Sequence, residues 1–577
     1  MIDASVLASV ALLSCGLLFL SSRDNGSGTM ILLCLLAPGL SNSLLGWLGL
    51  FSFSQISIDL GVVVLLLGFW WTRSQRARRQ ALTTEESANT WGIVVLPATY
   101  LMTFGVFQLV TGSRGLSFLL NTWDGSSNSG LVRALEVNPN LTMSATSITQ
   151  WENYPNFAHQ FAALVSRLIQ EILKDDPRTT LIVFAFVSST LYAVLVLQVG
   201  RLAASIVLLK FHKPRAATAT AIASQALFFS PSLINDFALM HSISFIAALI
   251  GTLIAIRSLL EVCSRRGLVT AGFAAILVSG SYPLLSLIPI IAWTVCALLD
   301  TRGISKKLLG AAALAPALVL TYSSLALNST DGRLQATGHI QTLPSWLVGG
   351  TTIVVLSLAA AQAKSRPNVT IVGITLLIFG VCQFLWESSP SRSRDYGLNY
   401  YAKKFEYAAL VILVPFLCAL LARLVLKALS SRSDGEALLT RHHGVGKSPV
   451  ILSFSLVAVL LVIASTMYTV VIPTERDRQA QVELEAAIEE ARRPGPGIIW
   501  YTGVQAKPLT PTLMANYLDK SLWREPFLED LNLRLFQAAQ GNATDRVTQE
   551  MCEVSSRRDV KTRVTYLNPR QYEYCES

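Results

Sequence analysis

The sequence of residues 180–200 is TLIVFAFVSSTLYAVLVLQVG, and it contains no charged side chain. The hydrocarbon core of a bilayer is about 30 Å thick, and an α-helix of about 20 apolar residues crosses it. This stretch therefore predicts a transmembrane helix. Lys210, Lys213 and Arg215 follow it, and basic residues of this kind mark the cytoplasmic end of a span.

The composition indicates that most of the chain lies in lipid. The chain has 577 residues, of which 52% are hydrophobic and only 14% are charged, whereas soluble domains carry about 25% charged residues. The net charge is +10, and the basic residues gather in short loops between apolar runs. That pattern is typical of membrane orientation rather than of nucleic-acid binding, and no interleaved basic and aromatic patch indicates a nucleic-acid partner.

Further apolar segments predict the remaining spans. They lie near residues 2–21, 29–50, 54–71, 91–111, 216–232, 242–260, 268–281, 284–299, 308–327, 346–362, 369–386, 406–426 and 449–471. The first segment lacks a basic leader and a small-residue cleavage site, so we expect it to be retained as a helix. The predicted fold is an α-helical polytopic membrane protein with about 12–14 transmembrane helices in residues 1–471.

Basic clusters between the predicted spans set the orientation. Arg76–Arg79, Arg265–Arg266 and Lys306–Lys307 are examples, and the positive-inside rule places such loops in the cytoplasm. The outer side then carries the loops 112–179, 233–241, 328–345 and 387–405, together with the tail 472–577. We expect a multi-pass protein of the plasma membrane with an extracytoplasmic C-terminal domain.

Loop 112–179 is the longest outer segment and holds two features. Asp124 stands in Asn121-Thr122-Trp123-Asp124-Gly125, which is interpreted as an outer loop with good turn residues. Glu152 precedes Pro155, which begins a predicted amphipathic helix with Phe157 and Phe161 on its apolar face. We expect this helix to lie along the outer membrane surface, with Glu152 and His159 close to the lipid headgroups.

Loop 387–405 is rich in cations and tyrosines. It contains Arg392, Arg394, Tyr400, Tyr401, Lys403 and Lys404. Cations on the outer face run against the positive-inside rule, so they need a reason, and an anionic lipid phosphate is a natural ligand. Binding of bulk anionic lipid is the alternative to a specific site.

This layout resembles the polytopic GT-C glycosyltransferases, particularly the actinobacterial arabinofuranosyl- and mannosyltransferases that build cell-envelope glycans. The resemblance rests on Trp123-Asp124-Gly125, on residues 154–159 and on residues 400–404. It implies transfer of a sugar from a polyprenyl-phosphate donor to a glycan or lipid acceptor at the outer face. The implied partners are membrane lipid, the donor and the glycan acceptor.

The resemblance also implies roles for the candidate residues. Asp124 is the expected catalytic base, with Asp236 and Glu152 as secondary acid/base candidates. The expected substrate-binding residues are His159, Arg392, Arg394, Tyr400, Tyr401, Lys403 and Lys404, whose cations would stabilise the leaving phosphate.

Two features differ from the family pattern. Asp124 follows a later span than the usual acidic residue, and no adjacent pair of carboxylates accompanies it. The sequence therefore indicates no metal ligand set and no certain cofactor, and it leaves a divalent cation, Mg²⁺ or Mn²⁺, open.

The tail 472–577 predicts a small α/β domain. Strands are expected at 498–502 and 563–567, with helices near 511–519, 526–539 and 543–557 between them. Cys552 and Cys575 are the cysteines outside the apolar spans. Because the tail is predicted to face the oxidising side of the membrane, we expect them to form a disulfide.

Other interpretations stay open at this point. A polytopic transporter or flippase of envelope lipids is the first alternative, although it would be expected to carry ionisable residues within its spans, where we expect almost none. A non-catalytic envelope-assembly protein is the second. Among the site residues, Asp124 could be a simple turn residue, Asp236 a helix cap and His159 a structural group.

Overall fold

The computed structural model describes most of the helical part of the chain. The described residues are chiefly 29–48, 84–111, 123–137, 156–172, 176–211, 213–234, 242–261, 265–299, 314–321, 345–362, 366–388, 400–433, 449–471, 498–502 and 562–566, with parts of 482–492. The predicted spans near 2–21 and 54–71 lie largely or wholly outside them.

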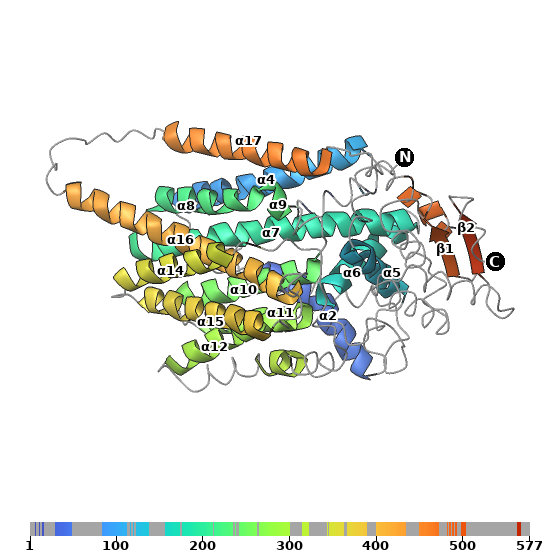
Figure 1. Cartoon of the computed structure of the whole chain (residues 1–577), viewed down its shortest axis with the longest axis horizontal. Coiled ribbons are helices and arrows are strands. Elements are labelled where there is room, and N and C mark those ends of the chain that lie inside the picture. The colour runs from blue at the N-terminus through green and yellow to red at the C-terminus, as the bar shows by residue number, and fades with distance from the viewer. Residues whose placement is uncertain are drawn as a thin grey trace.

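The described structure is a bundle of helices with one short pair of strands. The helices are α2 (Thr29–Leu48), α4 (Thr84–Thr111), α5 (Trp123–Val137), α6 (Phe157–Ile172), α7 (Pro177–Phe211), α8 (Pro214–Ala226), α9 (Pro231–Leu233), α10 (Ile243–Glu261), α11 (Arg265–Ser281), α12 (Leu287–Leu299), α14 (Ser345–Ala361), α15 (Arg366–Ser388), α16 (Tyr400–Ser433) and α17 (Pro449–Val471), with the 3₁₀ turns η2 (Leu227–Phe229) and η4 (Pro283–Leu285). Most of the long helices run side by side, and α5, α6 and the strands lie at the same end (Figure 1).

Three helices in the described part of the chain are long and apolar enough to cross a membrane. They are Pro177–Phe211, Ile243–Leu260 and Lys403–Ala428. Shorter apolar helices surround them, and several expose large apolar side chains, such as Met102 of α4 (67%) and Trp346 of α14 (74%). Outward apolar surface of this kind is typical of contact with lipid or with a partner. The bundle therefore has the composition and shape of a membrane protein.

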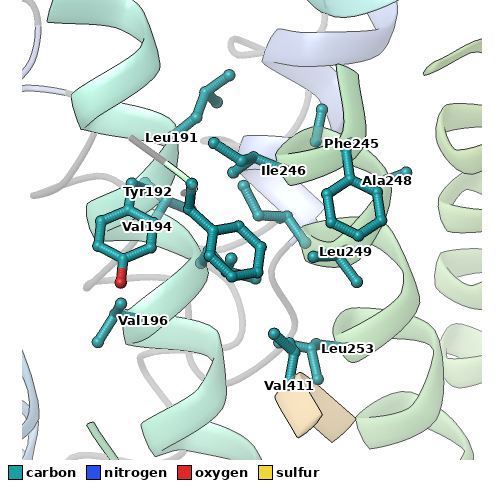
Figure 2. Close-up of a cluster of buried hydrophobic side chains, with 14 of the residues drawn as sticks. Leu191, Tyr192, Val194, Val196, Phe245, Ile246, Ala248, Leu249, Leu253 and Val411 are labelled. Atoms are coloured by element: carbon teal, nitrogen blue, oxygen red, sulfur yellow. The ribbon is translucent and has the colours of Figure 1, made fainter. Parts of the chain in front are cut away.

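The centre of the bundle is the contact between α7 and α10. Both helices are apolar on all sides, and their spanning segments are fully buried, as expected for helices at the middle of a bundle. Figure 2 shows Leu191 and Tyr192 of α7 beside Ile246 and Leu249 of α10, with Val411 of α16 close to Leu253. The predicted spans near 180–200, 242–260 and 406–426 thus form the core helices.

The aromatic ring of Phe157 lies between α2 and α11. A Cβ atom on Gly39 would meet this ring at 2.4 Å, and a Cβ atom on Gly280 would meet it at 2.5 Å. Both glycines therefore leave room for a buried ring that a larger residue would displace. We call this ring between Gly39 and Gly280 the Phe157 wedge. It holds the first residue of α6 against α2 and α11.

Helix α6 begins close to where the sequence predicts it, but its expected position on the membrane surface is wrong. His159, Gln160 and Arg167 are buried, as are Phe157 and Phe161 on the apolar face. The reason is α5, which the sequence interpretation treated as a loop: Asp124 and Gly125 belong to its first turn. This helix packs on α6 and covers its polar face.

A polar network connects α5, α6 and α7. Arg133 and Glu136 of α5 form an ion pair at 2.7 Å, and Thr180 of α7 donates a hydrogen bond to Glu136 Oε1 at 2.8 Å. Gln170 of α6 donates to Glu136 Oε2 at 3.1 Å. Because both charged side chains are almost fully buried, the network must be satisfied internally, and it holds the three helices in one arrangement.

The C-terminal end of α5 is capped by a cation from α6. Arg167 donates hydrogen bonds to the backbone carbonyls of Leu135 and Glu136, the latter at 3.1 Å. These carbonyls belong to the last turn of α5, where a positive charge is favourable.

Part of the tail packs against the start of α7. Leu484, Ala487 and Ile488 are buried, and Glu485 forms an ion pair with Arg178. Arg492 binds Asp176 at 2.7 Å. The tail segment 482–492 therefore lies at the end of the bundle that carries α5, α6 and the start of α7, which we name the α5–α6 end.

The first strand has the predicted bounds, and the second begins one residue before the predicted 563–567. β1 (Ile498–Thr502) pairs in parallel with β2 (Thr562–Tyr566), and Ile498 is aligned with Thr562. The predicted helices between the strands lie outside the described residues, and so do Cys552 and Cys575. The α/β domain and its disulfide stay predictions.

The Phe157 wedge gives a testable prediction. We expect Gly280→Ala to lower the stability by about 1–3 kcal/mol, because the added methyl group meets a rigid ring. The measurement is thermal unfolding of the purified protein in detergent.

The matched control is Gly349→Ala in α14, where a Cβ atom meets nothing within 4 Å. Alanine is the better helix former, so this variant should be neutral or slightly more stable. Equal effects of the two substitutions would contradict the wedge.

Candidate functional site

The first turn of α10 is the meeting point of two predicted site residues. Ser244 Oγ lies 3.2 Å from His159 Nδ1 of α6. The next residue, Phe245, lies under Lys404 of α16, whose Nζ is 5.7 Å from the ring centroid. Two segments that are far apart in the sequence thus contact neighbouring residues of one helix.

His159 connects α5 to α10 through both ring nitrogens. Its Nε2 lies 3.1 Å from Asn128 Oδ1 of α5. An amide oxygen only accepts, so Nε2 donates to Asn128 and Nδ1 accepts the hydrogen of the Ser244 hydroxyl. Burial lowers the pKa of His159 to about 3. The ring is therefore neutral at physiological pH and serves as a fixed hydrogen-bonding bridge.

Lys404 is buried among aromatic rings. Its Nζ lies 5.6 Å from the ring centroid of Tyr282 and at a similar distance from Phe245, which is the range of cation–π attraction. The expectation that Lys403 and Lys404 stand in an exposed loop is wrong, because α16 already begins at Tyr400 and both lysines are buried in it. The connection between α15 and α16 therefore covers only residues 389–399.

An aromatic cluster backs this position. Phe237 lies 5.9 Å from Phe245, 5.4 Å from Tyr407 and 5.9 Å from Tyr192, measured between ring centroids. Tyr192 also donates a hydrogen bond to the carbonyl of Phe228. Such contacts restrict side-chain rotation, so the start of α10 packs against a rigid group of aromatic rings.

Asp124 is the second residue of α5, one helical turn before Asn128. Residues four apart share a helix face, so Asp124 and the partner of His159 lie on the same face of α5. A carboxylate near a helix N-terminus is also favoured by the helix dipole.

The structure thus connects part of the predicted site. Asp124 and His159 lie on the packed pair α5 and α6, and Tyr400, Tyr401, Lys403 and Lys404 lie in the first turns of α16. Glu152, Asp236, Arg392 and Arg394 lie outside the described residues.

Three residues at this place were missed from the sequence: Asn128, Ser244 and Tyr282. Asn128 becomes visible only when residues 123–137 are recognised as a helix, because its distance from Asp124 is then one turn. The signal for Ser244 is a hydroxyl at the beginning of an apolar span. Tyr282 stands directly before Pro283 at the end of α11, where the helix must stop.

In the part of the chain that the structure describes, no three His, Cys, Asp or Glu side chains gather in a way that could hold a metal ion. Comparisons with known proteins add no assignment: no family model matches the chain, and no curated protein matches it significantly.

The bridging role of His159 predicts how stability depends on pH. Its pKa in the folded state is far below the usual value of about 6.5, so the unfolded chain takes up the proton more readily. The contribution of the neutral ring is complete above about pH 6.5 and is lost as the pH falls toward 3. At pH 5 we expect a loss of about 2 kcal/mol relative to pH 7.

Thermal unfolding between pH 7 and pH 4.5 tests this. His159→Gln cannot titrate, so its stability should fall less steeply with decreasing pH than that of the wild type. His442→Gln removes a histidine between α16 and α17 and should keep the wild-type slope. If the stability of His159→Gln falls with decreasing pH as steeply as that of the wild type, protonation of His159 does not destabilise the fold.

Proposed function

We propose that this chain is a GT-C-type membrane glycosyltransferase, which transfers a sugar from a polyprenyl-phosphate donor to a cell-envelope acceptor at the α5–α6 end. One observation supports this most strongly. The described residues of the three segments that carry the family resemblance are 123–125, 156–159 and 400–404, and they lie at the starts of α5, α6 and α16. Hydrogen-bond and cation–π contacts connect these helices around the first turn of α10.

The proposed reaction is a single displacement. The acceptor hydroxyl attacks the anomeric carbon of the donor sugar and gives its proton to Asp124. The bond between that carbon and the phosphate oxygen breaks, and the polyprenyl phosphate leaves with the bonding electrons. Lys404 supplies positive charge near the leaving phosphate, and its buried position makes that charge act more strongly than it would in water.

A transporter or flippase is the second candidate, and one observation favours it. Arg257 of α10 and Glu406 and Arg423 of α16 are buried within helices that could span the membrane. The expectation that the spans hold almost no ionisable residues is therefore wrong. Such residues often mark transport pathways.

The arginines also have structural partners, which weakens that candidate. Arg423 donates to Asn368 Oδ1 of α15 at 2.8 Å and to the backbone carbonyl of Ile206 of α7. Arg257 donates to Gln198 Oε1 of α7 at 3.2 Å. These bonds join neighbouring helices, a role that needs no substrate.

The test of the proposed function is product formation by the purified protein. Radiolabelled polyprenyl-phosphate arabinose and polyprenyl-phosphate mannose are offered together with envelope glycan acceptors, in lipid nanodiscs. Label in the acceptor supports transfer. Movement of the intact donor across proteoliposomes without any transfer would favour the flippase.

Asp124→Asn should lower the transfer rate by roughly 10²–10⁴-fold, which is the usual contribution of a general base. The control is Glu171→Gln, which removes an exposed carboxylate from α6 and should leave the rate unchanged. Wild-type activity in Asp124→Asn would move the role of the base to Asp236 or Glu152.

Lys404→Met should weaken donor binding more than acceptor binding, because methionine keeps the length of the side chain and removes its charge. The measurement is the KM for each substrate. We expect the KM of Lys404→Arg for the donor to lie between those of the wild type and Lys404→Met. Lys213→Met, at an exposed lysine directly before α8, is the control. An unchanged KM for the donor in Lys404→Met would contradict contact between this lysine and the phosphate.

A further inference from the structure

The tail segment 482–492 is amphipathic and meets the bundle with one face. Its described residues are helical. Leu484, Ala487 and Ile488 share one face at helical spacing and are buried, whereas Val482 on the other side is 59% exposed. Helices shorter than about 12 residues are marginal in water. The helical form of this segment therefore depends on its packing against the bundle.

Charged side chains lie beside the apolar face and form ion pairs with the start of α7. Glu485 pairs with Arg178, and Arg492 Nη2 lies 2.7 Å from Asp176 Oδ2. Arg492 Nη1 also lies 3.0 Å from Oε2 of Glu489, one turn earlier in the same segment. The contact thus combines an apolar face with two ion pairs to α7.

The order of these charges favours one direction of docking. In the tail segment the negative Glu485 precedes the positive Arg492, and before and within α7 the negative Asp176 precedes the positive Arg178. The observed pairs join opposite charges. A segment docked in the reverse direction would bring Arg492 to Arg178 and Glu485 to Asp176, and like charges in contact are unfavourable. Charge order therefore discriminates against the reversed arrangement.

The contact is small enough to open while the bundle stays folded. The side chains of the ion pairs keep between 13% and 63% of their surface exposed. Ion pairs in such surroundings contribute little to stability, and salt screens them. Among the described residues of the segment, the buried apolar side chains are Leu484, Ala487 and Ile488. Elements with so few buried apolar contacts belong to the parts of a protein that open locally.

Docking of this segment limits the position of the strands that follow it. β1 begins at Ile498, six residues after Arg492, and six residues span at most about 20 Å. While the segment is docked, β1 therefore stays near the α5–α6 end, where Figure 1 shows both strands.

We propose that segment 482–492 is a reversible clasp, which docks on the start of α7 in a direction set by its ion pairs and holds the strands of the tail at the α5–α6 end. In the released state the segment loses its helical form, and the strands are tethered to the end of α17 at Val471. High ionic strength favours release because it screens the ion pairs. The clasp does not depend on the proposed function.

Hydrogen–deuterium exchange of the purified full-length protein in lipid nanodiscs tests the clasp. Mass spectrometry follows peptides that contain residues 482–492, whose backbone amides are protected while the segment is docked and helical. Exchange of these peptides should be roughly fivefold faster in about 1 M salt than in about 0.1 M salt, because two ion pairs are screened. Exchange of α10, at the centre of the bundle, should not change.

Charge reversal distinguishes an oriented clasp from general electrostatic attraction. Arg178→Glu and Glu485→Arg should each make exchange of the segment roughly fivefold faster, since each variant places like charges together. The double variant restores an opposite pair and should exchange within about twofold of the wild type. Glu171→Arg is the matched control, because it reverses an exposed carboxylate of α6 and should leave exchange of the segment unchanged.

The apolar face has its own matched pair of variants. Ile488→Ala removes buried apolar surface and should also make exchange faster. Val482→Ala, at an exposed position of the same segment, should stay close to the wild type.

Four outcomes would overturn the proposal. The first is wild-type exchange of residues 482–492 that is complete at the earliest time point, because the segment would then not be docked. The second is exchange that does not depend on salt. The third is a double reversal variant that exchanges as fast as the single variants, and the fourth is an equal effect of Glu171→Arg and Glu485→Arg.

Discussion

Burial of the polar face of α6 is the constraint on which the α5–α6 end depends. Histidine, glutamine and arginine side chains on this face are removed from water, and each buried polar group must find a hydrogen-bond partner. Asn128 and Glu136 of α5, Thr180 of α7 and Ser244 of α10 supply partners. The position of α5 follows from this requirement, and so does the position of Asp124 in its first turn.

The same requirement explains which parts of the structure could be predicted from the sequence. Apolar runs of about 20 residues can be recognised from hydropathy alone, so the three helices that are long and apolar enough to cross a membrane lie where the sequence predicts them. The predicted span 216–232, in contrast, is divided into α8, η2 and α9. The segment Trp123–Gly130 is rich in glycine, serine and asparagine, which favour turns, and it nevertheless forms a helix. Tertiary contacts with α6 outweigh local propensity there, and a sequence does not show them.

The candidate site, too, could be predicted only in part. Its residue types were recognisable, because carboxylates, histidines and lysines are unusual in an apolar chain. Their surroundings were not. Lys404 was expected in an outer loop at a lipid phosphate and lies among Phe245 and Tyr282, and His159 was expected at the lipid headgroups and bridges two helices. Burial depends on contacts such as that of His159 with Ser244, which is 85 residues away along the chain, and composition carries no information about such pairs.

The contact between the tail and α7 has a consequence for biosynthesis. Arg178 and Glu485 are separated by 307 residues, and a ribosome adds roughly 5–20 residues per second. The start of α7 is therefore made roughly 15–60 s before its partner in the tail exists. During that interval Arg178 and Asp176 lack their tail contacts, and the apolar residues Leu484 and Ile488 have not yet covered this surface. The α5–α6 end therefore gains these contacts only after helices α7–α17 have been synthesised, and a chain truncated before residue 482 would lack Leu484, Glu485 and Ile488.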